Sequence, residues 1–377
     1  MLHRIGDIYA ERSERGAADM ELLSVTMNGG VMQRSEIEGK DNSSEDKSNY
    51  KVVRKGDMVY NSMRMWQGAN GVSPYDGIVS PAYTVLTAKL PICNEYFAAL
   101  FKNYKLINEF KKNSQGMTSD TWNLKYPQIK TIKVYLPRVT EQEKVASLLV
   151  TLDKRIAAQA TLVEQLKKYK RGVMQRIFRN MSILSPSGFE TVQLSAIFKK
   201  VSRRNSNGEI KNVITNSAEY GLIPQRDFFD KDIAVDGNTS NYYVIEHGDF
   251  VYNPRKSNTA PYGPFNRYER EERGIISPLY TCLVLQADIE PSYLAWYFKS
   301  DAWYRYIYDN GSQGVRYDRV SMTDGLLMGI PVIIPSKEAQ LKIAKLLDCL
   351  ESRFQTELSQ YESLKSIRVA LLQQLFI

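Results

Sequence analysis

The sequence predicts an α+β fold in which two globular domains of mixed α and β structure are joined by two long helices. The helices are expected to form an antiparallel coiled coil, and the two copies to have a pseudo-twofold relation. Three observations predict this fold. The chain of 377 residues repeats itself, each copy ends in a long stretch without proline, and short β-type runs alternate with helical runs before each of these stretches.

The repeat runs through the whole chain. The segment GIVSPAYTVL, which begins at Gly77, returns as GIISPLYTCL at Gly274. The spacing between matched residues grows from 189 near the start of the copies to 198 and then stays constant, so that Gln142 falls on Gln340. Each copy therefore has a globular part that accepts insertions and a final part of fixed length. The predicted domains are residues 1–139 and 181–336, and the predicted helices are residues 140–180 and 337–377.

The globular parts combine runs of both types. In the first copy, YKVVRKGDMVYN and GIVSPAYTVLTA are typical of strands, and NEYFAALFKNYKLINEFKK is typical of a helix; the second copy has matching runs. Gly56–Asp57 and Gly248–Asp249 fit turns between β runs. The pattern does not determine which strands pair.

The final part of each copy is predicted to be one helix. Thr140 and Glu143 fit a capping box, in which each side chain satisfies a free backbone N–H. Apolar residues then recur in alternating steps of four and three, which is the 3.5-residue period of a coiled coil.

Polar residues interrupt the apolar seam at the same two places in both copies. They are Gln159 and Lys170 in the first helix, and Glu357 and Arg368 in the second. Antiparallel pairing can set Lys170 against Glu357 and Gln159 against Arg368, whereas parallel pairing would set Lys170 against Arg368, two like charges in a buried seam. The alternative is two surface helices, each packed on its own domain.

Composition restricts the functional class. The formal charge of +8 and the pI of about 9.1 permit a polyanionic partner, although residues 181–336 carry more acidic than basic side chains. With two histidines and three scattered cysteines, the chain lacks a multi-histidine metal site or a disulfide framework. No run approaches the roughly 20 apolar residues of a membrane span, and the N-terminus lacks a secretory signal. We expect a cytoplasmic protein with reduced thiols and no contact with membranes.

The motifs of nucleotide-dependent and metal-dependent catalysis are missing. The sequence contains no G-x-x-x-x-G-K-[ST] loop and no H-E-x-x-H. Asn253-Pro254 is followed by Arg255 and Lys256, not by the Pro-Pro-aromatic sequence of an adenine methyltransferase. We therefore expect a chain that is not an enzyme by itself and that has no cofactor or metal site.

The repeated helical segments TEQEKVASLLVTLDKRI and SKEAQLKIAKLLDCLESRF resemble those of the specificity subunit of type I restriction–modification enzymes. The segments KGDMVYNSMRMWQGANGVSPYDGIVSPAYTVL and HGDFVYNPRKSNTAPYGPFNRYEREERGIISPLYTCL resemble that family's target recognition domains, and the resemblance covers essentially the whole chain. It implies a subunit that reads a split, asymmetric site in double-stranded DNA, one half per domain. It also implies two modification subunits and restriction subunits as partners, with S-adenosylmethionine, ATP and Mg on those partners and none here.

Side chains that recognise bases are forked donors and amides, with Arg binding guanine and Asn or Gln binding adenine. Such residues gather in two loops of each copy. The candidates for DNA contact are Asn61, Arg64, Trp66, Gln67, Lys111, Lys112, Ser114, Gln115 and Thr118 in the first copy, and Asn253, Arg255, Lys256, Ser312, Gln313, Arg316, Tyr317 and Arg319 in the second.

Simpler interpretations stand beside these. Trp66 and Trp122 can be core residues, the basic run Lys167–Arg171 can be a solvated helix flank, and Arg203 and Arg204 can face phosphate or only water. As a whole, the chain can instead be a two-lobed coiled-coil scaffold for protein partners that never binds DNA. The missing motifs disfavour a third class, a self-sufficient nuclease or methyltransferase.

Overall fold

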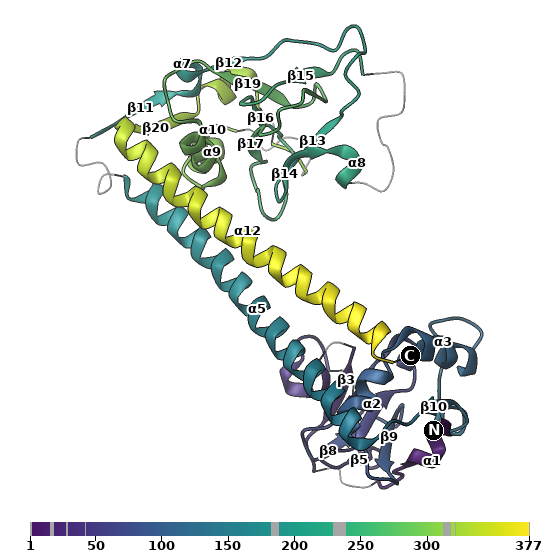
Figure 1. Ribbon diagram of the computed structural model, residues 1–377. Helices are drawn as coiled ribbons and strands as arrows, with labels where there is room; N and C mark the ends of the chain where they lie inside the picture. Colours follow the sequence, from purple (N-terminus) through teal and green to yellow (C-terminus); the bar gives the residue numbers. More distant parts are fainter. Residues whose placement is uncertain are drawn as a thin grey trace. The chain divides into compact units, whose positions relative to one another are not determined.

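The computed structural model describes residues 2–15, 19–27, 29–41, 43–181, 188–228, 239–311, 318–320 and 322–376 (Figure 1). The chain divides into two compact units. Unit 1 comprises Met1–Thr161 with Leu358–Ile377, and unit 2 comprises Leu162–Glu357. Each of the two long helices, α5 (Val139–Arg179) and α12 (Lys337–Gln374), contributes one part to each unit.

Unit 1 is built on a four-stranded antiparallel sheet with the strand order β2-β9-β6-β7. The strands are β2 (Tyr9–Glu11), β9 (Tyr83–Ala88), β6 (Met58–Asn61) and β7 (Asn70–Val72). Three strand pairs accompany the sheet: β1 (Leu2–Arg4) with β10 (Lys133–Tyr135), β3 (Leu23–Thr26) with β4 (Gly30–Gln33), and β5 (Lys51–Val53) with β8 (Gly77–Val79). The short helices are α1 (Ile5–Ile8), η1 (Arg34–Glu36), η2 (Met65–Gln67), α2 (Asn94–Leu100), α3 (Tyr104–Asn113) and α4 (Tyr126–Ile129).

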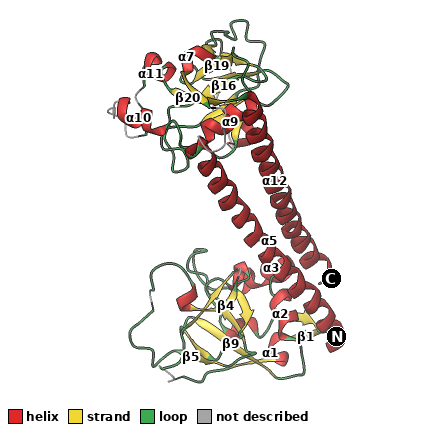
Figure 2. Cartoon of the chain, turned by 90° about the vertical axis from the view of Figure 1, so that its left-hand side faces the viewer, coloured by secondary structure: helices red, strands yellow, loops and turns green. Residues whose placement is uncertain are grey.

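Unit 2 has the same strand order, β12-β19-β16-β17. These strands are β12 (Phe198–Lys200), β19 (Thr281–Leu285), β16 (Phe250–Tyr252) and β17 (Phe265–Arg267). The accompanying pairs are β11 (Phe189–Gln193) with β20 (Pro331–Pro335), β13 (Ile214–Ser217) with β14 (Gly221–Pro224), and β15 (Tyr243–Ile245) with β18 (Gly274–Ile276). The short helices are α7 (Leu194–Ile197), α8 (Gln225–Phe228), α9 (Pro291–Lys299), α10 (Tyr304–Asn310) and α11 (Asp324–Met328); Figure 2 shows the strands and helices of both units. The mixed α and β structure expected from the sequence is confirmed.

The repeated decapeptide has a structural explanation. Its first three residues form β8 in unit 1 and β18 in unit 2, and both strands are buried. A Cβ on Gly77 would lie 2.5 Å from the carbonyl oxygen of Glu21, and one on Gly274 would lie 2.4 Å from Cγ1 of Ile214. Both positions therefore need glycine because a neighbouring strand passes too close for a side chain.

Each unit has its own apolar core, and both long helices enter it. In unit 1, Leu149 of α5 and Leu372 of α12 join the cluster around Phe97. In unit 2, Ile177 of α5 and Leu347 of α12 belong to one cluster with the sheet residues. The alternative in which each helix packs only on its own domain is therefore wrong.

Within each unit the two helical segments run in opposite directions, but the predicted register is wrong. In unit 2, Lys170 pairs with Glu351 where Glu357 was predicted, and its amino group also lies 4.6 Å from the centre of the Phe354 ring. In unit 1, Arg368 pairs with Asp153 where Gln159 was predicted. Both partners lie six residues before the predicted ones. A slide of about one heptad preserves the apolar seam, so the acidic residues beside the seam determine the choice.

The beginning of α5 also differs from the prediction. The backbone N–H of Arg138 donates to the Glu141 carboxylate at 3.0 Å, and α5 starts at Val139. The carboxylate that caps the helix is therefore that of Glu141, and the predicted pair Thr140 and Glu143 does not form the cap.

In the part of the chain that the structure describes, no helix is both long and apolar enough to cross a bilayer.

Candidate nucleic-acid interface

In unit 1 the two candidate loops meet. The first, residues 61–68, follows β6, and the second, residues 114–124, follows α3. The backbone N–H of Leu124 donates to the carbonyl of Ser62 at 2.9 Å, and the rings of Trp66 and Trp122 pack edge to face with centroids 5.2 Å apart. Both tryptophans are half-buried and lie outside the main clusters of unit 1, so they join the loops to each other and are not core residues.

The second loop has a defined shape. Gln115 and Asn123 exchange two backbone hydrogen bonds of 3.0 and 2.8 Å. Gly116 has φ of +143°, and a Cβ there would lie 2.6 Å from the Thr121 carbonyl oxygen. The Ser-Gln-Gly element thus determines backbone geometry in unit 1. Its second occurrence, with Ser312 and Gln313, lies outside the described residues.

The candidate side chains of unit 1 fall into two groups. Asn61 and Ser114 serve the loops themselves: the side-chain Oδ1 of Asn61 accepts from the N–H of Met63 at 3.0 Å, and the Ser114 hydroxyl donates to the Phe110 carbonyl at 2.7 Å. Arg64, Gln67 and Gln115 form no side-chain hydrogen bond with the residues that the structure describes. Their donors and acceptors are available to a ligand.

Two lysines in the last turn of α3, just before the second loop, are exposed. Lys111 lies 5.8 Å from the centre of the Trp66 ring, and Lys112 forms a 2.7 Å pair with Glu109. Thr118 is exposed, with its hydroxyl 3.4 Å from that of Thr121. These lysines are suited to phosphate contacts, which position a protein on DNA without reading sequence.

In unit 2 the loop after β16 pairs with a short described segment, residues 318–320. The N–H of Lys256 donates to the Asp318 carbonyl and that of Val320 to the Pro254 carbonyl, each at 2.9 Å. Arg255 is exposed, and Arg319 lies opposite it in this bridge. Arg255, Lys256 and Arg319 therefore come together, whereas Arg316 and Tyr317 lie outside the described residues.

Asn253 does not belong to the exposed set. Its side chain is buried, donates to the Asn216 carbonyl at 3.1 Å and accepts from the N–H of Arg255 at 2.9 Å. It holds the loop in place, and we remove it from the candidates for base contact. Beside it, Arg255 and Lys256 line a hollow of about 490 Å³ together with Thr259.

Arg203 and its neighbour have intramolecular partners. Arg203 bonds to the buried carboxylate of Asp249 and pairs with Glu246, and Arg12 bonds to Asp57 in the same way in unit 1. Burial raises the pKa of Asp249, although the N–H of Glu246 and the Arg203 guanidinium oppose this. The repeated Gly-Asp turns thus anchor an arginine. Arg204 lies 5.3 Å from the Tyr243 ring.

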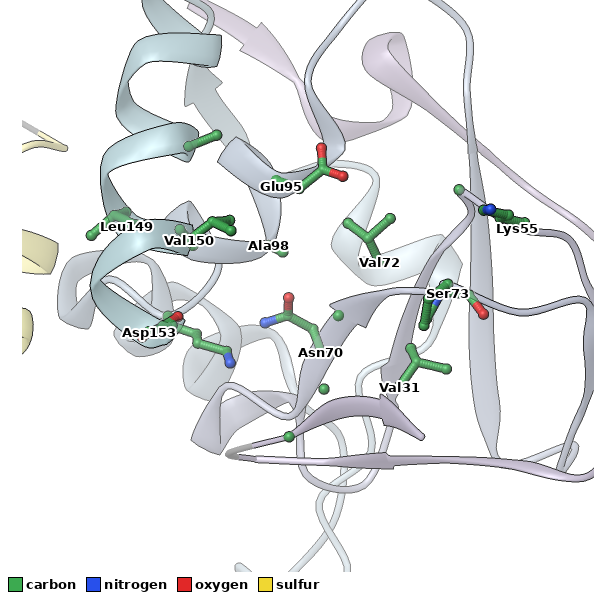
Figure 3. A pocket seen from close by; sticks show the side chains of 18 of the residues that line it. Val31, Lys55, Asn70, Val72, Ser73, Glu95, Ala98, Leu149, Val150 and Asp153 are labelled. Carbon is green, nitrogen blue, oxygen red and sulfur yellow. The ribbon is translucent and has the colours of Figure 1, made fainter. Parts of the chain in front are cut away.

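A groove runs along the helices in each unit. In unit 1 it has a volume of about 520 Å³, and Figure 3 shows Asp153 and Val150 of α5 facing Asn70 of β7 and Glu95 of α2. In unit 2 a groove of about 560 Å³ is lined by the corresponding elements, α9, β17 and the Lys170–Glu351 pair. The two grooves are a shared feature of the fold.

Exposed apolar side chains also recur on the helices, and the sequence analysis missed them. In unit 1, Leu148 and Ile367 are 49% and 50% exposed; in unit 2, Leu346 and Tyr169 are 47% and 61% exposed. These residues match each other at the repeat spacing of 198. The sequence contains the pattern that identifies them, because they are apolar residues at matched positions of the two copies outside the 4,3 seam.

Lys167 and Lys168, beside Tyr169, are exposed as a helix flank. Among the described residues, no group of three or more His, Cys, Asp or Glu could hold a metal ion.

The chain is similar to known specificity subunits. Residues 17–168 match the family model of the type I restriction modification DNA specificity domain. Two relatives come from Methanocaldococcus jannaschii. The putative type I restriction enzyme MjaX specificity subunit is 24% identical over 212 residues, and the type I restriction enzyme MjaVIII specificity subunit is 29% identical over 130 residues. The first match covers 49% of each chain, the second 34% of this chain and 29% of the relative. The chain thus spans about half the length, or less, of these relatives.

Solved structures agree over the full length. The HsdS subunit from Thermoanaerobacter tengcongensis has a TM-score of 0.53 at 16% identity, covering 100% of this chain and 96% of that one. The S subunit of a type I restriction-modification system from M. genitalium has a TM-score of 0.57 at 15% identity, with the same coverage. At these identities the likeness concerns the fold alone. The family model over residues 17–168 and the two sequence relatives therefore relate this chain to the specificity subunits of type I restriction–modification enzymes.

Proposed function

We propose that the chain is the DNA-recognition subunit of a type I restriction–modification complex. Unit 1 binds one half of a split, asymmetric duplex site and unit 2 binds the other. The observation that carries the proposal is that the two units share one strand order but carry different polar side chains on their loops. Unit 1 has the half-buried Arg64 with the exposed Gln67 and Gln115, and unit 2 has the exposed Arg255 with the half-buried Lys256 and Arg319.

The chemistry of these side chains suits duplex DNA. Guanidinium and amide groups read base edges in the major groove, and neighbouring lysines bind phosphate. Because the two sets differ, two different half-sites are expected. The long helices would act as a spacer between the two units: a continuous helix rises 1.5 Å per residue, so about 40 residues span about 60 Å, between one and two DNA turns of about 34–36 Å each.

The helices also offer a place for assembly. Each unit presents one pair of exposed apolar side chains on the helices: Leu148 and Ile367 in unit 1, and Leu346 and Tyr169 in unit 2. Because the two pairs occupy equivalent positions of the repeat, they would give two copies of one partner equivalent apolar contacts. Two modification subunits suit this arrangement, with restriction subunits joining them. S-adenosylmethionine, ATP and Mg would belong to those partners, and the complex would act in the cytoplasm.

The test is selection from a randomised duplex library by the full chain assembled with its modification subunits. We expect one split sequence to be enriched, and affinity to fall with salt by counterion release. Arg64→Ala should relax the preference at one base pair in one half, and Arg255→Ala at one base pair in the other, each with a loss of about 1–3 kcal/mol in discrimination.

A control is Arg54→Ala, because this exposed arginine of unit 1 already pairs with Glu14 at 2.9 Å. It should select the same sequence as the unaltered chain. If the unaltered complex enriches no sequence and its duplex binding does not depend on salt, the chain is a protein scaffold and the proposal fails.

A further inference from the structure

Met117 is the most exposed large apolar side chain among the residues that the structure describes. Its exposed fraction is 99%, compared with 49% for Met27, another methionine of unit 1. A thioether side chain is flexible and polarisable, and it is suited to contact with an irregular partner surface. Its position in a candidate recognition loop of unit 1 raises the question of what it contacts.

The exposure of Met117 follows from the geometry of its loop. The backbone bonds between Gln115 and Asn123 close the loop, and the Thr121 hydroxyl donates to the Thr118 carbonyl at 2.9 Å within it. At Gly116 the positive φ and the close Thr121 carbonyl leave no room for a side chain. Met117 is therefore held at the tip of a closed loop, away from the apolar core that it would otherwise join.

The base of this loop is fixed to the rest of the interface. Leu124 is fully buried and Trp122 packs on Trp66 of the first loop, which also carries Arg64. The loop that carries Met117 and the loop that carries Arg64 are thus joined at their bases.

The charge around Met117 indicates the partner. Between residues 111 and 125 the chain has three lysines, Lys111, Lys112 and Lys125, and one acidic residue, Asp120. An apolar tip among cations matches a nucleic acid better than an apolar protein surface, because phosphates attract the lysines while bases offer apolar faces and thymine methyl groups.

We propose that Met117 is a base-contacting residue that determines specificity in the half-site bound by unit 1. Its side chain lies against base atoms, either a thymine methyl group or a base step that it partly opens, as apolar side chains do in other complexes. This proposal rests on the proposed function of the chain.

The experiment compares three variants in the full chain assembled with its modification subunits. Met117→Ala should lower affinity for the duplex selected by the unaltered complex by about tenfold, the loss expected for removing one buried apolar side chain. It should leave affinity for unrelated duplex and the melting temperature unchanged, and relax the preference within one half-site only. Gly116→Ala, which distorts the loop, should give the same relaxation. Met27→Ala, the exposed methionine on a different hairpin, should behave like the unaltered chain.

The outcomes separate the two proposals. If the unaltered complex selects a sequence but Met117→Ala selects it equally well, Met117 has no role in specificity while the proposed function stands. If Met117→Ala weakens assembly with the modification subunits and leaves base preference intact, its partner is protein and the inference is overturned. If the unaltered complex selects no sequence, both proposals fail.

Discussion

The buried glutamine near the start of each long helix should stabilise its unit more than any other polar residue of that helix. In unit 1, Gln142 accepts from the N–H of Cys93 and donates to the Pro137 carbonyl, both at 2.9 Å. In unit 2, Gln340 makes the same two bonds, also at 2.9 Å, to the N–H of Glu290 and the Pro335 carbonyl. The exposed fractions of the two side chains are 1% and 3%.

The expected loss follows from what each alanine leaves behind. A buried donor or acceptor without a partner costs about 1–3 kcal/mol. In Gln340→Ala the orphaned Pro335 carbonyl belongs to a buried residue, whereas Cys93 and Pro137 in unit 1 are half-buried and can recover bonds to water. We therefore expect about 3 kcal/mol for Gln340→Ala and about 2 kcal/mol for Gln142→Ala. At about 2–4 °C per kcal/mol for a unit of this size, the first lowers the melting temperature of unit 2 by roughly 6–12 °C.

Differential scanning calorimetry of the full chain would measure both changes. The control is Gln165→Ala, an exposed glutamine on α5, which should change stability by less than about 0.5 kcal/mol. Gln340→Glu measures the two hydrogen bonds separately. It keeps the acceptor for the N–H of Glu290, but it removes the donor to the Pro335 carbonyl and places a carboxylate against that oxygen. The reasoning is refuted if both buried glutamines can be replaced at no more cost than Gln165.

Four further predictions concern the scaffold. Lys170→Glu should destabilise unit 2, and adding Glu351→Lys should restore about 1 kcal/mol in a double-mutant cycle monitored by urea unfolding. Burial raises the pKa of Glu351, but hydrogen bonds from Gln355 and Lys170 outweigh burial, so the net pKa lies below the usual value. The stability that this carboxylate contributes is therefore fully present above its ordinary pKa of about 4.3. It is lost as the pH falls through the lowered pKa. Gly77→Ala should cost about 1–3 kcal/mol because its Cβ meets backbone, whereas Gly172→Ala in α5, with nothing within 4 Å, should stabilise by up to about 1 kcal/mol. Cys282 is 2% exposed and burial raises its pKa to about 12, so iodoacetamide at neutral pH should label it only when unit 2 unfolds, as peptide mass spectrometry would show.

The long helices could be predicted from the sequence because their signal is local and repeated over many turns. Proline before each helix and the 4,3 apolar pattern give bounds within a few residues of α5 and α12. Their register could not be predicted, because sliding one helix by about a heptad leaves every apolar contact formally intact. The choice depends on Asp153 and Glu351, which lie beside the seam and which a seam pattern omits.

The strand pairing and part of the candidate interface were beyond sequence reasoning for a different reason. Most strands have three to five residues, and partners such as β2 and β9 lie far apart in the chain, so no local pattern identifies them. Asn253 has the side chain of an adenine-reading residue, but its partner Asn216 comes from another hairpin. Only the fold shows that its amide is already used.

The comparison of the two copies also separates scaffold from recognition. Gly77 and Gly274, and Gln142 and Gln340, are repeated where the backbone leaves no room or where a buried bond must be made. By contrast, residues that project from the loops without an internal role, such as Arg64 and Met117, have no such constraint from the fold. A change in target should therefore require substitutions only in the loops, because a loop residue whose side chain forms no internal hydrogen bond can be replaced at little cost in stability. The repeated residues are conserved between copies by packing and hydrogen bonding, and this constraint leaves the loops able to diverge.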